Sequence, residues 1–543
     1  MKELKDLKGL VSRLEAERNS FDGHWGELAS NMAPRRIRLN NADPNKGDKR
    51  NQSIKDETPL IAVNTLKSGM MGGVTSPARE WFKLGLQTPT SNLSKESKEW
   101  LEIVTKRMQL IFSRSNLYRA LPTLYGDIGV FGTGVIGVEE DFSGEVVRFI
   151  TFPVGSYCLA TNHKRKVNTF TRAFKLTPYQ VVSQFGRINE KGEAVGDNIS
   201  DKTKEAFKAS GKTVYIECAH VVQPNHKWNP DDPTSFRYNS IYFEMGEERK
   251  FLRKGGFQYF PVLATRWETT GEDVYGTNCP GMQALPAIKE LHLMELKSIQ
   301  AIEKMINPPM KAPISMKTQV ASVLPGDVNY VDNIGGDFAP LYQVKFPIAE
   351  HEAKQQSVRG RIFEVFYYNL FLIFSEGIGN RDRVTATEIQ ARKDEKLQVL
   401  GPTLEALNED LLEPLINVTY SIMAGQGLLP PAPPEMQNQP LKVNYVSILH
   451  QAQQLLNLSG HDRFLAYLQN VGQISQELMD SVDFDRMTKD YADILGIPPH
   501  LLRSDNEVKK IRESRAQAQQ AQTQNAEATA ATETAAKVAQ AVK

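Results

Sequence analysis

Near the middle of the chain, two long helical segments enclose a short segment of different character. Residues 286–306 carry apolar side chains at three- and four-residue steps, as a helix with one apolar side does. Residues 349–376 form the second helical segment, which becomes rich in phenylalanine and tyrosine. At 1.5 Å per residue each helix would span roughly 30 to 40 Å. The pattern predicts a stalk of two helices with a small strand-and-turn module, residues 309–348, at its tip.

The length and composition predict a folded protein with several packing units. The chain has 543 residues, and one hydrophobic core stops growing at about 250 to 300 residues. Hydrophobic residues make up 40% of the sequence and charged residues 24%, which is typical of globular proteins. The 65 Lys and Arg balance the 64 Asp and Glu, so no overall field attracts phosphate and tight DNA binding is not expected. Charge alone therefore does not decide what the protein does.

The cysteines and the apolar stretches indicate the compartment. Cys158, Cys218 and Cys279 lie about sixty residues apart, without the CxxC pairs of common zinc sites. We expect buried free thiols in a reducing compartment. The charged first helix lacks the apolar core of a secretory signal, and the longest apolar stretch, residues 365–374, is too short to span a membrane. We therefore expect a soluble intracellular protein with no membrane partner.

The remaining segments predict an α+β fold. The first hundred or so residues should be mostly helical, with a polar arm at residues 33–58. Residues 134–268 alternate apolar and polar side chains between Gly, Asn and Asp turns, which predicts a β-rich unit with two short helices. Residues 385–504 should be helical, beginning at a capping box of Thr385 and Glu388 and kinked at Pro402 and Pro414. The Ala- and Gln-rich tail, residues 505–543, should be disordered or helical only within an assembly.

Two strings resemble nucleotide-binding motifs but lie between the wrong elements. GTGVIG, Gly132–Gly137, follows a helical pattern and precedes a strand, whereas a dinucleotide site needs a strand before it and a helix after it. SGKT, Ser210–Thr213, has Ala206 where a phosphate-binding loop requires its first glycine. We interpret both strings as turns.

No other cluster predicts catalysis or metal binding. His220 and His226 have no Cys or carboxylate at a metal-ligand spacing, so we expect core or surface histidines. Glu139, Glu140 and Asp141 precede Gly144 at an apparent hairpin, where acidic residues are common. We predict no catalytic residue, no metal site and no cofactor.

Four segments in chain order resemble the head-to-tail connector (portal) family of short-tailed bacteriophages, the podoviruses. They cover most of the chain from about residue 60 to residue 425, and the second and third begin at Asp127 and Tyr275. The segments are GGVTSPAREWF, DIGVFGTGV, YGTNCPGMQALPAIKEL and RVTATEIQAR. Combined with the helix, tip, helix arrangement, they identify the chain as a member of that family.

The resemblance implies a portal fold with wing, stem, clip and crown. Residues 1–285 would be the wing, 286–308 and 349–376 the stem helices, 309–348 the clip, 377–384 a channel loop, 385–504 the crown and 505–543 a tail. It also implies a ring, typically of twelve subunits, in the virion at the capsid vertex and assembled in the host cytoplasm. The implied partners are the terminase motor, tail adaptor proteins, capsid and scaffold proteins, and the double-stranded DNA that passes through the channel.

Two sets of residues are candidate contacts. We hypothesise that Arg381 and Arg383, on a glycine-flanked loop, touch passing DNA through weak phosphate contacts, and the alternative is that they pair with carboxylates such as Asp382 or Glu376. The segment at the tip is too small to have its own core, so its apolar residues should pack against neighbouring chains. These clip residues are Val323, Leu324, Tyr330, Val331 and Ile334.

Two other classes of protein stay open at this stage. An internal virion or scaffold protein would lack the paired stem helices and need not form a closed ring. A nucleotide-binding packaging enzyme would need the glycine that Ala206 replaces.

Overall fold

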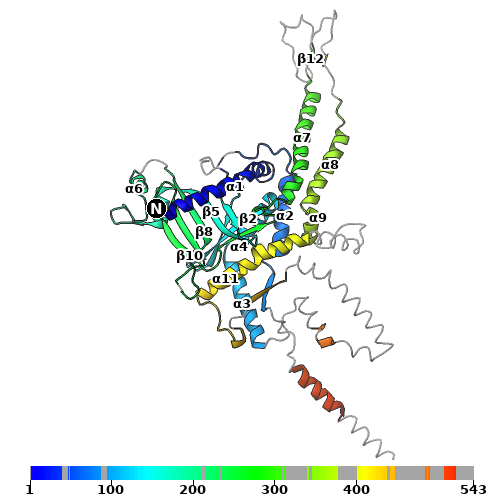
Figure 1. The fold of residues 1–543 in the computed structure, drawn as a ribbon. Coiled ribbons are helices and arrows are strands. Elements are labelled where there is room, and N and C mark those ends of the chain that lie inside the picture. The colour runs from blue at the N-terminus through cyan, green and yellow to red at the C-terminus, as the bar shows by residue number, and fades with distance from the viewer. Residues whose placement is uncertain are drawn as a thin grey trace, which may run out of the picture. The chain divides into compact units, whose positions relative to one another are not determined.

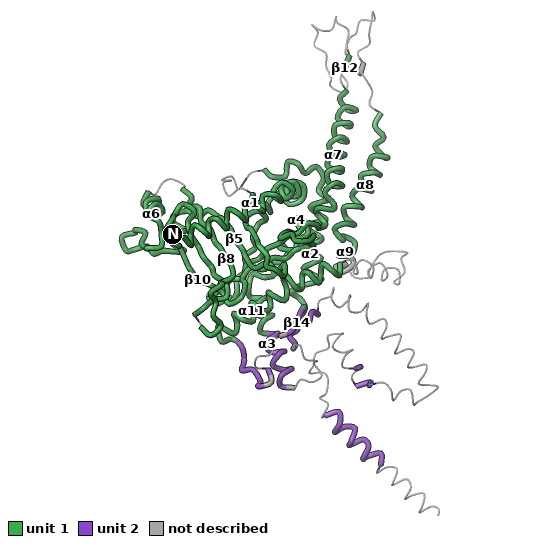
Figure 2. The backbone as a smooth tube through the Cα atoms, in the orientation of Figure 1, with its two compact units in different colours: residues 1–81, 107–428, 447–453 green, residues 82–106, 429–446, 454–543 purple. Residues whose placement is uncertain are grey.

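A computed structural model describes most of the chain. The described residues are 2–39, 47, 49–86, 95–142, 144–209, 214–232, 234–308, 310–311, 339–340, 345–376, 400–436, 441–446, 483–485, 487–488 and 507–520. They fall into two compact units (Figure 2). The first comprises residues 1–81, 107–428 and 447–453, and the second comprises residues 82–106, 429–446 and 454–543. Segments far apart in the sequence thus belong to the same unit.

Three helices begin the first unit, namely α1 (Lys2–Met32), α2 (Thr58–Val74) and α4 (Leu117–Phe131). α1 buries Leu4, Leu7, Val11 and Leu14, which lie on one side because their spacing matches the helical repeat. α4 packs against α2 and ends at Gly132, whose φ of 76° is left-handed. A Cβ there would lie 3.0 Å from the carbonyl oxygen of Gly276, so glycine is required for both conformation and space.

Two antiparallel sheets form the β-rich part of the first unit (Figure 1). The smaller sheet has the order β11 (Val262–Arg266), β2 (Thr133–Asp141), β3 (Val146–Phe152). The larger sheet has the order β10 (Arg253–Phe257), β9 (Tyr238–Glu244), β8 (Ile216–Pro224), β5 (Val167–Leu176), β4 (Cys158–Thr161). A two-residue pair, β6 (Arg187–Ile188) and β7 (Ala194–Val195), lies apart from both. The strands of both sheets lie between Thr133 and Arg266, where the sequence predicted strands.

The two faces of the larger sheet bury different partners. α1 covers one face, where Leu4, Leu7 and Val11 pack with Ala219 and Val221 of β8. The short helices α5 (Pro178–Phe185) and α6 (Asp201–Lys208) belong to the other side, with Val181 and Val182 of α5 packing against Ile216 and Cys218 of the same strand. Successive residues of a strand point to opposite faces, so β8 serves both cores. Both short helices were predicted, and a capping box of Thr177 and Gln180 starts α5.

The first unit ends in a helix with a wider turn in it. Residues 400–407 are helical through Pro402, Asn408–Leu412 form the π-helical turn η3, and α11 (Glu413–Gly425) follows. Pro414 lacks a backbone N–H and its ring would clash with the preceding turn. The predicted kink at Pro414 therefore takes the form of a π-turn, in which the amide of Glu413 donates to the carbonyl of Asn408. The expected start of this helix at Thr385 lies outside the described residues.

The second unit contains a two-stranded sheet and helical segments. β1 (Phe82–Leu86) pairs with β14 (Leu441–Tyr445). The predicted helix near residue 100 is α3 (Lys95–Arg114), of which residues 95–106 belong to this unit and the rest to the first. A short 3-10 turn, η4 (Pro434–Met436), precedes β14. Residues 507–520 form a helix, and its Arg512 donates two hydrogen bonds of 2.6 Å to Asp485. The described part of the predicted tail is thus helical as far as residue 520.

Candidate functional site: a two-helix stalk and its base

Helices α7 (Pro280–Ile306) and α8 (Ile348–Val365) run side by side, away from the two sheets (Figure 1). Two short strands pair beyond them, β12 (Met310–Lys311) with β13 (Ala339–Pro340). Met310 lies opposite Pro340, so the chain leaves α7 and returns toward α8 at the same level. We call α7 and α8 together the stalk.

The expected start of the first stalk helix, Pro286, was six residues too late. α7 begins at Pro280, where a proline fits because the first-turn amides have no partner within the helix. Pro286 lies inside the helix, and burial of Ala284, Leu285 and Ile288 favours its continuation. Sequence spacing alone did not reveal this, because a proline usually marks a helix start or end.

The expected single helix over residues 349–376 is two helices. α8 ends at Val365 and α9 (Tyr368–Glu376) follows, with Tyr367 at a left-handed φ of 55° between them. The ring of Tyr367 stacks on Trp267, with centroids 6.3 Å apart. Phe371 packs onto Gly69 of α2, where an added Cβ would overlap its ring. Packing of these aromatic side chains therefore outweighs continuation of the helix.

A group of charged side chains joins the base of the stalk to α2. Arg359 of α8 donates to Asp56 at 2.7 Å and to Glu295 of α7 at 2.8 Å. The side chain of Asp56 is 6% exposed, and it also accepts the amide of Thr58 at 2.7 Å. Burial alone would raise the pKa of Asp56, but the hydrogen bonds from Thr58 and Arg359 hold it below its usual value. The carboxylate is therefore charged at neutral pH and binds three segments together.

His292 completes this base from α7. Its Nδ1 accepts the backbone amides of Lys55 and Asp56, each at 3.3 Å. Burial lowers the pKa of His292, which keeps the ring neutral and its Nδ1 able to accept. More exposed pairs lie beside it, including Arg361 with Glu290 at 2.8 Å. The stalk is thus fixed to the unit by polar contacts at one end.

Beyond His292, α7 buries no side chain of its own. Six apolar residues there are 37% to 79% exposed, Leu293 and Met305 among them, and the other four follow one another at steps of three, three and four residues. These four are Leu296, Ile299, Ile302 and Ile306, and we call them the α7 ridge. Scattered exposed apolar residues are common, but a continuous row on one helix is typical of a surface that another chain covers.

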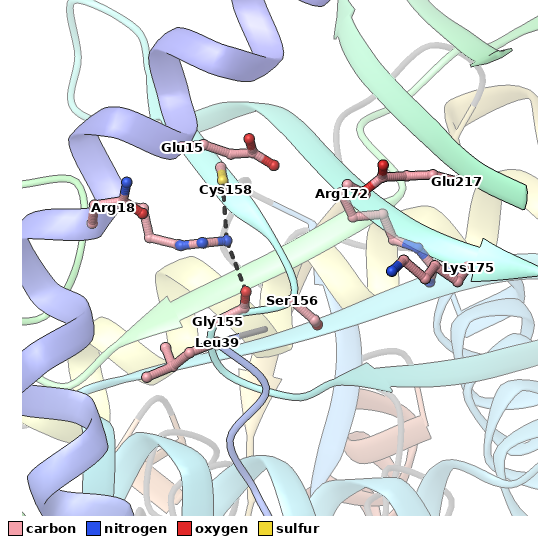
Figure 3. Close-up of a pocket in the computed structure, with 11 residues that line it drawn as sticks. Glu15, Arg18, Leu39, Gly155, Ser156, Cys158, Arg172, Lys175 and Glu217 are labelled. Carbon is pink, nitrogen blue, oxygen red and sulfur yellow. Dashed lines mark hydrogen bonds between the residues drawn. The ribbon is translucent and has the colours of Figure 1, made fainter. Parts of the chain in front are cut away.

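A polar recess of about 270 Å³ lies between α1 and the larger sheet (Figure 3). Arg18 from α1 donates to the carbonyl of Gly155 at 2.7 Å, and its Nε lies 3.3 Å from Asp22, so its charge is already compensated. Burial raises the pKa of Cys158 to about 11, which leaves this thiol protonated and unreactive. The other lining residues include Glu15, Lys175 and Glu217. The recess mixes both signs of charge and shows no activated group, so the stalk is the better candidate site.

Comparison with known proteins identifies the family. The family model for bacteriophage head to tail connecting proteins matches residues 4–502. The chain belongs to this family. The portal protein of Salmonella phage epsilon15 is 38% identical over 515 residues, covering 94% of this chain and 90% of the relative. The probable portal protein of Bordetella phage BPP-1 is 38% identical over 546 residues, covering 99% and 96%. The resemblance carried by the four sequence motifs is therefore confirmed.

Solved structures of gene transfer agent particles are more distant. The neck of an empty particle aligns over 82% of this connecting protein and 91% of its own chain, with a TM-score of 0.33 and 12% identity. The virion of a native particle aligns over 78% and 88%, with a TM-score of 0.32 and 11% identity. Similarity at this level carries no argument about details of the fold.

The two strings that resemble nucleotide-binding motifs were predicted to follow a helix and precede a strand, and the described residues around them have this order. In this family member GTGVIG joins the end of α4 to β2, and Gly132 serves the left-handed helix end. SGKT itself lies outside the described residues, but α6 precedes it and β8 follows it. Neither string has a helix N-terminus after it that could hold a phosphate.

The histidines and acidic residues considered in the sequence as catalytic or metal-binding candidates lie in the core, on the surface or at a turn. His220 stacks on Tyr242 with centroids 3.8 Å apart, and burial lowers its pKa to about 3, so it is a neutral core residue. His226 is exposed. Glu139, Glu140 and Asp141 end β2 at its hairpin with β3. In the described part of the chain no three His, Cys, Asp or Glu side chains are grouped to hold a metal ion, and no described helix is long and apolar enough to cross a membrane.

The candidate contact residues named from the sequence lie outside the described residues. Arg381 and Arg383 of the loop are among them, as are the five clip residues Val323, Leu324, Tyr330, Val331 and Ile334. Their roles stay predictions. Sequence reasoning missed Asp56, His292 and Arg359, because Asp56 and Arg359 are 303 positions apart and neither stands in a motif.

Asp56→Asn tests the base of the stalk. We expect the free energy of unfolding at pH 7 to fall by about 1–2 kcal/mol, because Arg359 loses its charged partner. The pKa of Asp56 is lowered in the folded state, so its contribution is complete above the unfolded pKa of about 4 and is lost as the pH falls through the folded pKa. Urea unfolding followed by tryptophan fluorescence should therefore show a deficit at pH 7 that shrinks as the pH falls below the unfolded pKa of about 4.

Glu27→Gln is the matched control, since Glu27 pairs with Lys289 at 2.5 Å in an exposed position. We expect it to change the free energy of unfolding by less than about 0.5 kcal/mol. Equal effects of the two variants at pH 7 would contradict a special role for Asp56.

Proposed function

We propose that this chain is the portal subunit of a bacteriophage and that its copies form a closed ring at one vertex of the capsid. DNA would be packaged through the ring and later ejected through it. The observation that carries the proposal is the 38% identity to two portal proteins across nearly the whole chain. The exposed α7 ridge supports it independently, because a neighbouring subunit would cover these side chains.

The mechanism of such a ring is geometric. Identical subunits joined by a heterologous contact close into a ring when the rotation between neighbours divides the circle, and a central channel remains. A nearly neutral chain lets DNA slide, since few phosphate contacts must be broken at each step. The subunit number is proposed as twelve, and the role as structural rather than enzymatic.

The parts of the chain are assigned by family resemblance. The stalk and α9 would form the stem, the residues before Pro280 the wing, the residues between α7 and α8 the clip, and residues 385–504 the crown. The terminase motor would dock at the clip during packaging, and tail adaptor proteins would replace it afterwards. Capsid and scaffold proteins would surround the ring in the virion, after assembly in the host cytoplasm.

Ring formation is tested on the purified full chain by native mass measurement and negative-stain electron microscopy. We expect closed rings with a hole that admits duplex DNA. Ile299→Asp should leave the subunit folded, because Ile299 is 57% exposed, but should prevent ring closure by placing a charge in the contact. Phe142→Asp, at an 83% exposed position in the β2–β3 hairpin, is the control and should still form rings. A wild-type chain that stays monomeric at all salt concentrations would favour the scaffold alternative.

The loop arginines are tested in packaging. The proposal rests on the sequence, in which Arg381 and Arg383 lie beside glycines in residues 377–384. Replacing both by Ala should reduce DNA packaging or retention, with an effect that weakens at high salt because exposed phosphate contacts are screened. Rings that package and retain DNA normally would remove this role, and the arginines would then be interface residues.

The clip is tested by deletion of residues 312–338. If its apolar residues pack against neighbouring chains, the deletion should abolish ring closure or adaptor binding, measured by electron microscopy and co-sedimentation. An intact ring that still binds both the motor and the adaptor would contradict the assignment.

A further inference from the structure

We propose that Arg172, Tyr242 and Arg253, on one face of the larger sheet, form a binding site for an acidic segment of a partner protein. The two arginines would hold carboxylate groups of that segment, and the hydroxyl of Tyr242 would donate a further hydrogen bond. All three residues belong to the first unit. The site goes beyond the proposed portal function and does not require the ring, because a single chain carries every residue of it.

The three side chains lie in one row across four neighbouring strands. Arg253 of β10 is paired with Tyr242 of β9. Tyr242 is paired with His220 of β8, and His220 with Arg172 of β5. Residues directly opposite on neighbouring antiparallel strands point to the same face, and the spacing of about 4.8 Å between strands places the backbones of the two arginines about 14 Å apart. The row therefore has a positive charge at each end and two aromatic rings between them.

Arg172 is held in place but has no acceptor. Its guanidinium carbon lies 4.2 Å from the ring centroid of Phe174 and 5.1 Å from that of Phe152. Such contacts fix the planar group without using its N–H donors. The Nε is buried, and within the described residues Arg172 makes no hydrogen bond or ion pair. A buried donor without an acceptor is costly, so this one calls for an acceptor that the chain itself does not supply.

This guanidinium lies on the face of the sheet away from α1. Arg172 contributes to the wall of the recess in Figure 3, but its guanidinium stacks on Phe174, which packs with the side chains of α5. Ala219 of β8 packs against α1 on the opposite face. The proposed site is thus separate from the compensated charge of Arg18 in the recess.

The electrostatics of Arg172 differ from those of a paired arginine. Burial lowers the pKa of Arg172, and the nearby Tyr242 and Glu139 only partly oppose this effect. Burial acts on Arg36 too, yet its hydrogen bond with Asp127 raises the pKa of Arg36. Arginine stays charged at neutral pH in either case. Arg172 is therefore a partly buried charge that lacks a bound carboxylate, and a carboxylate from another protein would remove this cost.

Tyr242 and Arg253 add two further donors to the row. Burial, followed by the charge of Glu139, raises the pKa of Tyr242 to about 12, so its hydroxyl keeps its proton at neutral pH. The ring stacks on His220 with centroids 3.8 Å apart, which fixes the direction of the hydroxyl. Arg253 is exposed. In the part of the chain that the structure describes, neither the hydroxyl of Tyr242 nor the guanidinium of Arg253 has a hydrogen-bond partner.

His220 reports that both arginines act on the middle of the row. Burial and then the charges of Arg172 and Arg253 lower the pKa of His220 to about 3. The ring is therefore neutral at physiological pH, and its Nε2 lies 3.0 Å from the hydroxyl oxygen of Ser240. The positive charge of the row thus comes from its two ends, where a ligand can reach it.

The surroundings favour a carboxylate on a protein over the phosphates of a nucleic acid. Glu139 of β2 lies near Arg172, and although it is directly opposite Arg148 of β3, it weakens any attraction for a polyanion. The net charge of +1 provides no wider field for phosphates. A guanidinium binds a carboxylate through two parallel hydrogen bonds, and aromatic side chains beside arginine are typical of protein contacts. An acidic protein segment fits this combination of groups.

Fluorescence anisotropy tests the site with the full-length chain and a fluorescein-labelled peptide of eight glutamates. We expect binding that Arg172→Met weakens at least about tenfold, because hydrogen bonds between charged groups are the strong ones. Arg172→Lys keeps the charge but loses the planar fork, so it should weaken binding about threefold. Arg253→Gln, at an exposed position, should weaken binding without affecting the fold.

Arg187→Met is the matched control. Arg187 of β6 is also exposed and has no ion pair among the described residues, so its loss should leave peptide binding unchanged. A labelled peptide of eight glutamines should not bind to the wild-type chain. Circular dichroism and urea unfolding check the fold of Arg172→Met, which should be at least as stable as the wild type because it removes an unpaired, partly buried charge.

Three results would overturn the proposal. The first is a wild-type chain that does not bind the glutamate peptide, and the second is equal affinity of the wild type and Arg172→Met for it. The third is displacement of the peptide by inorganic phosphate or duplex DNA at concentrations where acetate has no effect, which would assign the row to phosphate groups instead.

Discussion

The stalk depends on one buried carboxylate. Asp56 lies just before α2 and accepts the amide of Thr58, the first residue of that helix. The same side chain binds Arg359 of α8, which in turn binds Glu295 of α7. A charge that is 6% exposed is costly to bury unless it is paired and hydrogen-bonded, and here both conditions are met. Because hydrogen bonds to charged groups are directional, they fix the direction in which two long helices leave the unit, which apolar packing alone would define less sharply.

The sequence predicted those helices and strands whose formation depends on interactions between residues close together in the chain. The apolar spacing of α1, the capping box of α5 and the alternation of the strands are each contained in a few consecutive residues. The early start of α7 and the break at Tyr367 were not predictable in this way. Tyr367 takes its conformation beside Trp267, and Phe371 needs the open space at Gly69, so distant residues decide where the helix breaks.

For the stalk and its base, too, the local sequence predicted one part and only the folded structure revealed the other. The sequence displays an amphipathic pattern in α7, but the pattern cannot tell whether the apolar side faces the chain's own core or a neighbour. The structure separates the two cases within one helix: Ile288 and Leu291 are buried, whereas Ile299 and Ile306 are exposed. The residues of the base were invisible to motif searches, because a contact between Asp56 and Arg359 exists only after the chain has folded.

The first half of α7 is buried and its second half is exposed, so a neighbouring subunit that covered the second half would stabilise the helix. The fourteen residues from Leu293 to Ile306 bury no side chain in the single subunit, so apolar packing contributes little to the stability of this part of the helix, although α8 runs beside it. Covering a Leu or Ile side chain contributes about 1.5–3 kcal/mol, so a neighbour that covers the α7 ridge would stabilise the upper stalk as well as the ring. The polar base holds the lower stalk in place beforehand, which lowers the entropy lost when the next subunit binds. A rigid base and an exposed upper helix are therefore complementary properties of a subunit that would complete its fold in the proposed ring.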